Sequence, residues 1–216
     1  MPNSITAITA TPLDLNRTYY ETHATEYCKR TASLDLEALY EPFLSQIPPG
    51  GCILDAGCGS GRDGVAFVSR GYGVTAVDAS PAMVRAACER GLDAHLVTFQ
   101  EIQFESCFDG IWACASLLHV PHVEMSEVLR RFARALKPRG VFYTSLKEGK
   151  GERIAEDGRF FSYFSLDEFV TLLTEDKLFQ ILRAWKSEDP DSSGGMSPWL
   201  NFIARRTDES HGILDH

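Results

Sequence analysis

Three alternate glycines near residue 60 have the spacing of a ligand-binding turn. The apolar stretch 53–56 runs directly into Gly57, Gly59 and Gly61. Glycine permits a tight turn and lets the backbone approach a bound molecule closely. A helix that begins just after such a turn adds the free N–H groups of its first turn, which bind polar or anionic groups. The spacing therefore predicts a ligand site where this strand ends.

Two carboxylates accompany the glycines. Asp55 lies inside the apolar stretch, and Asp78 ends the next predicted strand, 78 − 57 = 21 residues after Gly57. An acidic side chain at that point of an α/β sheet can accept both ribose hydroxyls of an adenosine. A dinucleotide motif would need glycine where the chain has Arg62, and a phosphate loop would need Gly-Lys-Ser/Thr. A glycine turn without a ligand is the remaining alternative, but both carboxylates together favour adenosine.

A histidine follows the fourth predicted strand, residues 108–113. His119 lies just beyond the carboxyl end of that strand, at the edge where open α/β sheets bind ligands. An imidazole there can act as general base for a substrate proton, and with an ordinary pKa it would lose this ability as the pH falls past about 6.5. A histidine that only packs within the loop is the alternative interpretation.

A sheet must bring these groups to one edge. Apolar strand-like segments alternate with helical patterns, which favours an α/β domain with a mostly parallel sheet. The predicted strands are 52–56, 72–77, 94–98, 108–113, 141–146, 179–185 and 199–205, the last two paired as a hairpin. The predicted helices are 33–46, 63–69, 81–90 with Ser80 as its cap, 125–136 ending before Pro138, and one that begins at the capping box of Ser165 and Glu168.

Composition and charge exclude several classes of protein. The chain has 216 residues, 44% of them hydrophobic, with 21 basic and 30 acidic side chains and a net charge of −9. This balance counts against nucleic acid as the main partner. The uncharged stretch 111–123 is too short to span a bilayer, and residues 1–12 lack a secretion signal, so we expect a cytoplasmic protein without membrane partners. The six cysteines form no CxxC pair, and we expect no metal site.

The sequence ILDAGCGSG at 53–61, together with Asp78, resembles the class I S-adenosylmethionine-dependent methyltransferases over about residues 15–206. The resemblance implies a Rossmann-like three-layer α/β/α sandwich with a seven-stranded, mostly parallel sheet and an antiparallel last strand. It also implies S-adenosyl-L-methionine as cofactor and S-adenosyl-L-homocysteine as product. The residues that it places on the cofactor are Asp55, Gly57, Cys58, Gly59 and Ala115 near the methionine portion, Asp78 on the ribose, and Ala79 and Met83 on the adenine.

One position departs from the family pattern. The family often has an aspartate after the third strand that binds the adenine amino group, and here Thr98 occupies that position. The backbone of Phe99 and the side chain of Gln100 or Glu101 are the alternatives for this contact. Phe99 and Gln100 therefore complete the predicted adenine site.

The acceptor side is also read through the resemblance. Residues 108–121 resemble the corresponding stretch of small-molecule methyltransferases and lack the Asn/Asp-Pro-Pro-Tyr/Phe motif of amine- and amide-methylating enzymes. Residues 19–31 resemble a lid, in which Tyr20 and Tyr27 would close over the sulfonium by cation–π attraction and Arg30 would approach its carboxylate. A hairpin at 147–164 would cross the pocket mouth. The residues predicted to contact the acceptor are Tyr19, Phe161, Tyr163 and Arg153, with Arg159 as the alternative arginine.

These features predict a methyltransferase that acts on the oxygen, nitrogen or sulfur of a small molecule by in-line displacement, with His119 as its possible base. The alternatives are an RNA or protein methyltransferase, a chalcogen oxyanion (tellurite-type) methyltransferase, and a nucleotide-binding protein without activity. We expect a flexible tail at 1–12, a domain at 13–206 with a helical lid at 13–47 and an acceptor-side insertion at 147–164, and a disordered tail at 207–216. The chain would be a monomer or homodimer with a small-molecule partner.

Overall fold

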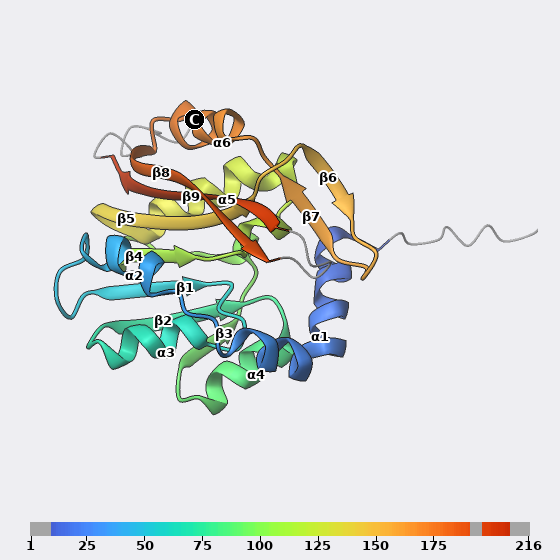
Figure 1. Cartoon of the computed structure of the whole chain (residues 1–216). Coiled ribbons are helices and arrows are strands. Elements are labelled where there is room, and N and C mark those ends of the chain that lie inside the picture. The colour runs from blue at the N-terminus through green and yellow to red at the C-terminus, as the bar shows by residue number, and fades with distance from the viewer. Residues whose placement is uncertain (1–9, 191–195, 208–216) are drawn as a thin grey trace, which may run out of the picture.

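The computed structural model describes residues 10–190 and 196–207 (Figure 1). The predicted tails therefore fall largely outside the described residues. Pro12, inside the predicted N-terminal tail, already begins a helix, because Thr11 caps it in a reciprocal hydrogen-bond box with Asp14. Within the described ranges, no helix is both long and apolar enough to cross a bilayer.

Seven strands form one twisted sheet, as the sequence predicted. They are β1 (Cys52–Ala56), β2 (Gly73–Asp78), β3 (Asp93–Leu96), β4 (Phe108–Ala113), β5 (Leu136–Lys147), β8 (Phe179–Pro190) and β9 (Met196–Arg206). Their spatial order is β3-β2-β1-β4-β5-β9-β8. The first five are parallel, whereas β9 runs antiparallel to both β5 and β8. The carboxyl ends of β1, β2 and β4 consequently meet at one edge.

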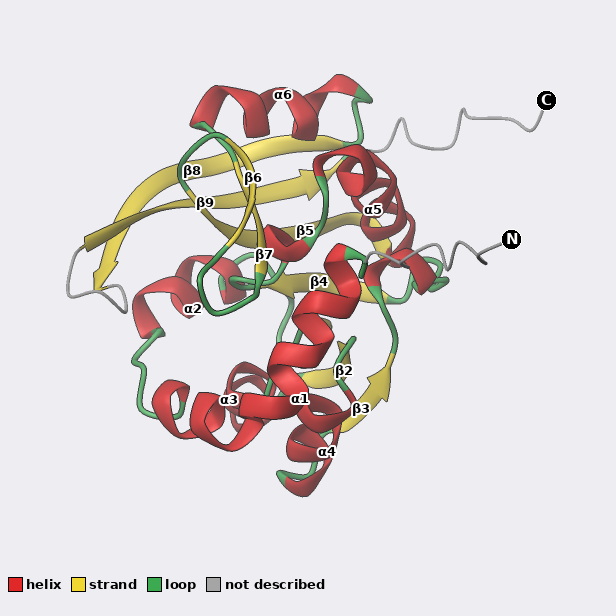
Figure 2. Ribbon diagram, turned by 90° about the vertical axis from the view of Figure 1, so that its right-hand side faces the viewer, coloured by secondary structure: helices red, strands yellow, loops and turns green. Residues whose placement is uncertain are grey.

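Helices cover both faces of the sheet (Figure 2). They are α2 (Glu37–Leu44), α3 (Arg62–Ser69) and α4 (Pro81–Glu89), then α5 (His122–Ala135) and α6 (Leu166–Glu175). Side chains alternate along the strands, so neighbouring residues serve opposite layers. Ile53 and Trp112 pack against α2 and α3, whereas Leu54 and Ile111 pack with the apolar stripe of α5. The predicted caps at Ser80 and Ser165 are present.

Two elements lie over the carboxyl edge of the sheet. The helix α1 (Pro12–Thr31) crosses in front of it, and the hairpin of β6 (Gly151–Ile154) and β7 (Phe160–Tyr163) stands beside α1 (Figures 1 and 2). The hairpin agrees with the prediction for 147–164. The helix predicted at 33–46 is shorter, at Glu37–Leu44, because the chain first turns after α1.

Some strands are longer than their apolar patterns. β5 begins at Leu136, and the segment around Pro138 forms an irregularity in its pairing with β4. β8 and β9 stay paired as far as Pro190 and Met196. Beyond Trp185 the sequence of β8 is polar, so no apolar alternation marks this part of the ribbon.

Candidate functional site

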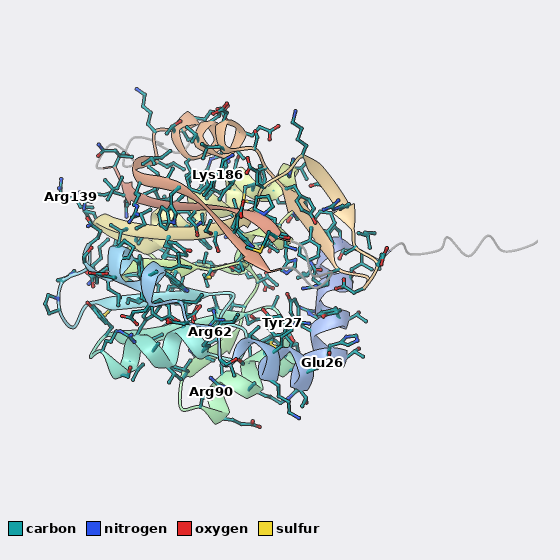
Figure 3. The ribbon with its side chains drawn as sticks, viewed as in Figure 1. Glu26, Tyr27, Arg62, Arg90, Arg139 and Lys186 are labelled. Atoms are coloured by element: carbon teal, nitrogen blue, oxygen red, sulfur yellow. The ribbon has the colours of Figure 1, made fainter. Side chains whose placement is uncertain are left out.

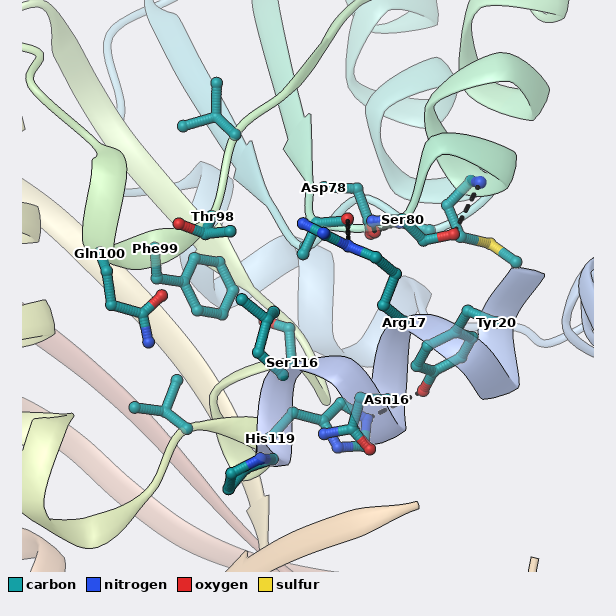
Figure 4. A pocket seen from close by; sticks show the side chains of 18 of the residues that line it. Asn16, Arg17, Tyr20, Asp78, Ser80, Thr98, Phe99, Gln100, Ser116 and His119 are labelled. Atoms are coloured by element: carbon teal, nitrogen blue, oxygen red, sulfur yellow. Dashed lines mark hydrogen bonds between the residues drawn. The ribbon is translucent and has the colours of Figure 1, made fainter. Parts of the chain in front are cut away.

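A cavity of about 580 Å³ opens at the carboxyl edge of the sheet, beneath α1 (Figure 4). Its walls come from α1, the turn after β1, the ends of β2 and β3, and the loop after β4. Eleven of the residues predicted from the sequence line it: Tyr20, Tyr27, Gly57, Gly59, Asp78, Ala79, Met83, Phe99, Gln100, Ala115 and His119. Segments far apart in the chain therefore meet at one site.

The glycine turn shapes one wall of the cavity. Gly57 has a φ of +78°, and a Cβ built on it would lie 2.4 Å from Cβ of Ser116. Gly59 has a φ of +53°, and a Cβ there would point toward the ring of Tyr27, 3.8 Å away. Gly57 is therefore required for packing, whereas Gly59 leaves open space in which a ligand can approach the backbone.

Asp78 is held with both carboxylate oxygens oriented. Oδ2 accepts the N–H of Gly59 at 2.9 Å, and Oδ1 accepts the N–H of Ser80 at 2.8 Å. Each oxygen keeps a further lone pair for a hydroxyl donor. Burial raises the pKa of this carboxyl above its ordinary value, partly offset by the backbone hydrogen bonds. The arrangement suits a pair of neighbouring hydroxyls.

Three of the predicted cofactor residues do not line this cavity. Asp55 is buried below the turn and accepts the N–H of Gly64 at 3.0 Å, which fixes the start of α3. Burial and the charge of Asp63 raise its pKa well above the usual range. Cys58 lies in a smaller hollow beside the turn, and Arg30 is exposed with its guanidinium over the ring of Tyr27.

Arg62, rather than Arg30, is the basic residue beside the glycine turn. It lines the small hollow together with Tyr27, near the end of α1 (Figure 3). Asp63 holds its guanidinium through two hydrogen bonds, of 2.6 and 3.0 Å. Asp63 in turn accepts from Tyr40 and Trp112, so the arginine is fixed by a buried network. The sequence analysis used Arg62 only to reject a dinucleotide motif.

The site contains a tyrosine–histidine pair that the sequence did not predict. Tyr20 Oη lies 2.9 Å from His119 Nε2, and His119 Nδ1 lies 2.9 Å from the carbonyl oxygen of Phe160. Because a carbonyl only accepts, Nδ1 carries the proton and Nε2 accepts the hydroxyl of Tyr20. Burial lowers the pKa of His119 to about 4, and the positive charges of Arg159 and Lys147 act in the same direction.

The predicted acceptor residues surround this pair without lining the cavity. The Phe161 ring lies 5.0 Å from that of His119, and Tyr19 makes an edge contact with Tyr20. Arg159 packs its guanidinium on Tyr19 at 4.5 Å and on Phe161 at 4.9 Å. On the neighbouring strand, Tyr163 is buried and the exposed Arg153 covers its ring at 4.1 Å.

Sequence reasoning missed several residues of the cavity wall. Asn16 exchanges two hydrogen bonds with the backbone of Phe160, and Arg17 donates to the carbonyl of Ala79 at 3.0 Å. Both side chains lie on the face of α1 that is turned to the cavity (Figure 4). Asn16 and Phe160 are 144 residues apart, so no local motif could have shown this contact.

Comparison with known proteins identifies the domain. A family model described as a methyltransferase domain matches residues 53–140. A solved structure of 1,6-didemethyltoxoflavin-N1-methyltransferase from Burkholderia thailandensis superposes with a TM-score of 0.72 at 25% identity, over 94% of this chain and 93% of that one. The chain belongs to the class I S-adenosylmethionine-dependent methyltransferases.

Two curated relatives of this methyltransferase chain match in part. The ubiquinone biosynthesis O-methyltransferase of Xanthomonas oryzae pv. oryzae is 31% identical over 104 residues, 44% of this chain and 43% of that protein. The cypemycin N-terminal methyltransferase of Streptomyces sp. is 28% identical over 131 residues, 57% of this chain and 54% of that protein. The match therefore spans about half the length of these relatives.

The residues of the cavity fit S-adenosylmethionine, the cofactor of this family. Gly59 leaves space beside the backbone where a larger residue would intrude, and Asp78 presents two oriented oxygens with free lone pairs. The rings of Tyr20 and Tyr27 lie 5.1 Å apart in the same wall, where aromatic faces can attract a sulfonium.

Proposed function

We propose that this chain transfers the methyl group of S-adenosylmethionine to a small organic acceptor at oxygen, nitrogen or sulfur. One observation carries the proposal: a single cavity holds an oriented carboxylate at Asp78 and, on another wall, the neutral Tyr20–His119 pair. The first suits a ribose, and the second suits an acceptor that must lose a proton.

The cofactor side of the proposal assigns binding to a few residues. S-adenosylmethionine supplies a methyl group already activated on a sulfonium, so the protein's main task is to align the reactants. Asp78 would accept the ribose hydroxyls, and the backbone at Gly57 and Gly59 would face the methionine portion. Tyr20 and Tyr27 would close the site from α1 and exclude water.

The acceptor side of the proposal assigns a proton route. When an O–H, N–H or S–H acceptor gives up its proton, Tyr20 Oη can take that proton as its own moves to His119 Nε2. The resulting imidazolium donates through Nδ1 to the carbonyl of Phe160, 2.9 Å away. His119 would thus act through Tyr20 rather than on the acceptor directly.

The relatives support a small acceptor. The Burkholderia structure holds 1,6-didemethyltoxoflavin with S-adenosylhomocysteine, and the Xanthomonas relative acts in ubiquinone biosynthesis. The cypemycin enzyme modifies an N-terminus, which makes a peptide amine the second candidate acceptor. The net charge of −9 counts against RNA.

A labelling experiment tests the proposal. The protein is incubated with S-adenosylmethionine carrying an isotopically labelled methyl group and a metabolite extract, and labelled products are identified by mass spectrometry. We expect one labelled small molecule, and Asp78→Ala should abolish it while weakening S-adenosylhomocysteine binding by roughly ten- to a hundredfold, the loss of charged hydrogen bonds. Label in a peptide fraction alone would favour the second candidate. No label in any fraction, or no binding of S-adenosylhomocysteine, would contradict the proposal.

A further inference from the structure

The end of the cavity beside β3 lacks a free acidic side chain. Thr98 and Glu101 instead cap the short 3-10 turn η1 (Phe99–Glu101). One oxygen of Glu101 accepts both the N–H of Thr98 at 3.0 Å and its hydroxyl at 2.8 Å. The carboxylate of Glu101 is therefore engaged within the turn, which leaves Gln100 as the polar side chain at this end.

Gln100 is held by a carboxylate from another element. Its Nε2 lies 2.6 Å from Oε2 of Glu124, in the first turn of α5, and both residues line the cavity. A carboxylate only accepts, so the amide nitrogen must face Glu124. The amide oxygen is then turned away from Glu124, toward the cavity (Figure 4). One hydrogen of Nε2 also remains for another acceptor.

This amide matches the edge of an aminopurine. Its oxygen can accept from an amino group while its second N–H donates to a ring nitrogen, the two-point pairing that glutamine makes with adenine. Ala79 and Met83 line the same cavity after β2, and Asp78 places the ribose between them and the glycine turn. A base attached to that ribose would meet Gln100.

We propose that Gln100 reads the amino edge of the cofactor's adenine and that Glu124 is the positioning residue that sets the orientation of its amide. This rests on the proposed function. It also separates Gln100 from Glu101, two side chains that the sequence left as alternatives.

The deaminated analogue S-inosyl-L-homocysteine is the matched probe. Its base has a carbonyl oxygen in place of the amino group and a ring N–H in place of the accepting nitrogen. Both partners of Gln100 are therefore reversed, while the ribose and the homocysteine are unchanged. Wild-type protein should bind S-adenosyl-L-homocysteine roughly tenfold to a hundredfold more tightly than this analogue by calorimetry.

Gln100→Ala should bring that ratio to about a tenth of its wild-type value or less, chiefly by weakening the adenosyl ligand. Glu124→Ala should lower the ratio as well, because the amide of Gln100 is then free to rotate. Glu124→Gln should restore most of it, since the new amide oxygen can still accept from Nε2. Glu127→Gln is the control: it lies on the same helix, half exposed and paired with three arginines.

Three outcomes bear on the inference separately. A wild-type protein that binds neither ligand would overturn the proposed function and this inference with it. Normal binding of S-adenosyl-L-homocysteine, with Gln100→Ala weakening both ligands equally, would overturn the reading of the base alone and leave Gln100 as a structural tie. An unchanged ratio in Glu124→Ala would remove Glu124 from the proposal.

Discussion

The two sides of the cavity are built in different ways. On the cofactor side, Gly57, Gly59 and Asp78 lie within 22 residues of sequence (78 − 57 + 1) and are joined by backbone hydrogen bonds. On the acceptor side, Tyr20, His119 and Phe160 come from three distant segments and meet through side chains. The first construction depends on backbone shape, and the second depends on how α1 and the hairpin dock.

The largest effect is expected where the cofactor side depends on a missing side chain. Gly57→Ala places a methyl group 2.4 Å from Cβ of Ser116 and strains a backbone with φ of +78°. Binding of S-adenosylhomocysteine should be lost in calorimetry. Gly71→Ala is the control because its φ is +86° but nothing lies within 4 Å of the added Cβ. It should cost only the backbone strain, about 1–2 kcal/mol of unfolding free energy, and bind normally. Equal effects of the two changes would show that strain alone, and not space at the turn, governs Gly57.

The same contrast explains what the sequence could predict. The glycine spacing and Asp78 are local patterns, and the structure brings the cofactor residues predicted from them around one cavity, apart from Asp55, Cys58 and Arg30. Those three share the right neighbourhood in sequence, but Asp55 and Cys58 point below the turn and Arg30 faces outward. Side-chain direction at a turn depends on packing that no spacing encodes.

The acceptor side was predictable as elements but not as contacts. The hairpin at 147–164 followed from its sequence, and so did a helical lid before the core. The bond between Tyr20 and His119 joins residues 99 positions apart, and its existence depends on the angle at which α1 crosses the sheet edge. Asn16 sets that angle through its two bonds to Phe160, and nothing beside Asn16 in the sequence marks it.

An intermediate effect is expected from His119 as the pH changes. Its pKa is about 4 in the folded chain, against about 6.5 unfolded, so the unfolded chain takes up the proton first as the pH falls. Stability is therefore lost between pH 6.5 and 4, on the order of 3 kcal/mol from this residue. His119→Gln should remove that part of the pH dependence in urea unfolding.

The charges around His119 decide this result. Arg159 and Lys147 oppose its protonation and Asp157 favours it, while Tyr20 and the Phe160 carbonyl hold both ring nitrogens. Nitrogen-15 spectra should show the Nδ1–H tautomer and no titration at pH 6.5. An unchanged slope in His119→Gln, or an ordinary titration near 6.5, would refute the buried pair. A base that stays neutral at pH 6.5 also removes the activity loss that an ordinary histidine would cause there.

The smallest effect should come from Arg153, and its comparison with Arg159 tests the acceptor side directly. The sequence could not choose between them, because the outcome depends on which face of the hairpin each side chain takes. Arg153 is exposed and touches only the outer side of Tyr163's ring among its printed ring contacts, whereas Arg159 is enclosed by Tyr19 and Phe161 and paired with Asp157. Arg153→Gln should change the unfolding free energy by less than about 0.5 kcal/mol, as for most surface substitutions.

Arg159→Gln provides the contrast. Removing its charge should raise the pKa of His119 in nitrogen-15 titrations, because a nearby cation disfavours the imidazolium. Arg153→Gln should leave that pKa where it is, and neither change should alter S-adenosylhomocysteine binding at the opposite wall. If Arg153→Gln moved the titration of His119 and Arg159→Gln did not, the hairpin would present its other face to the site, and the acceptor side would have to be rebuilt around Arg153.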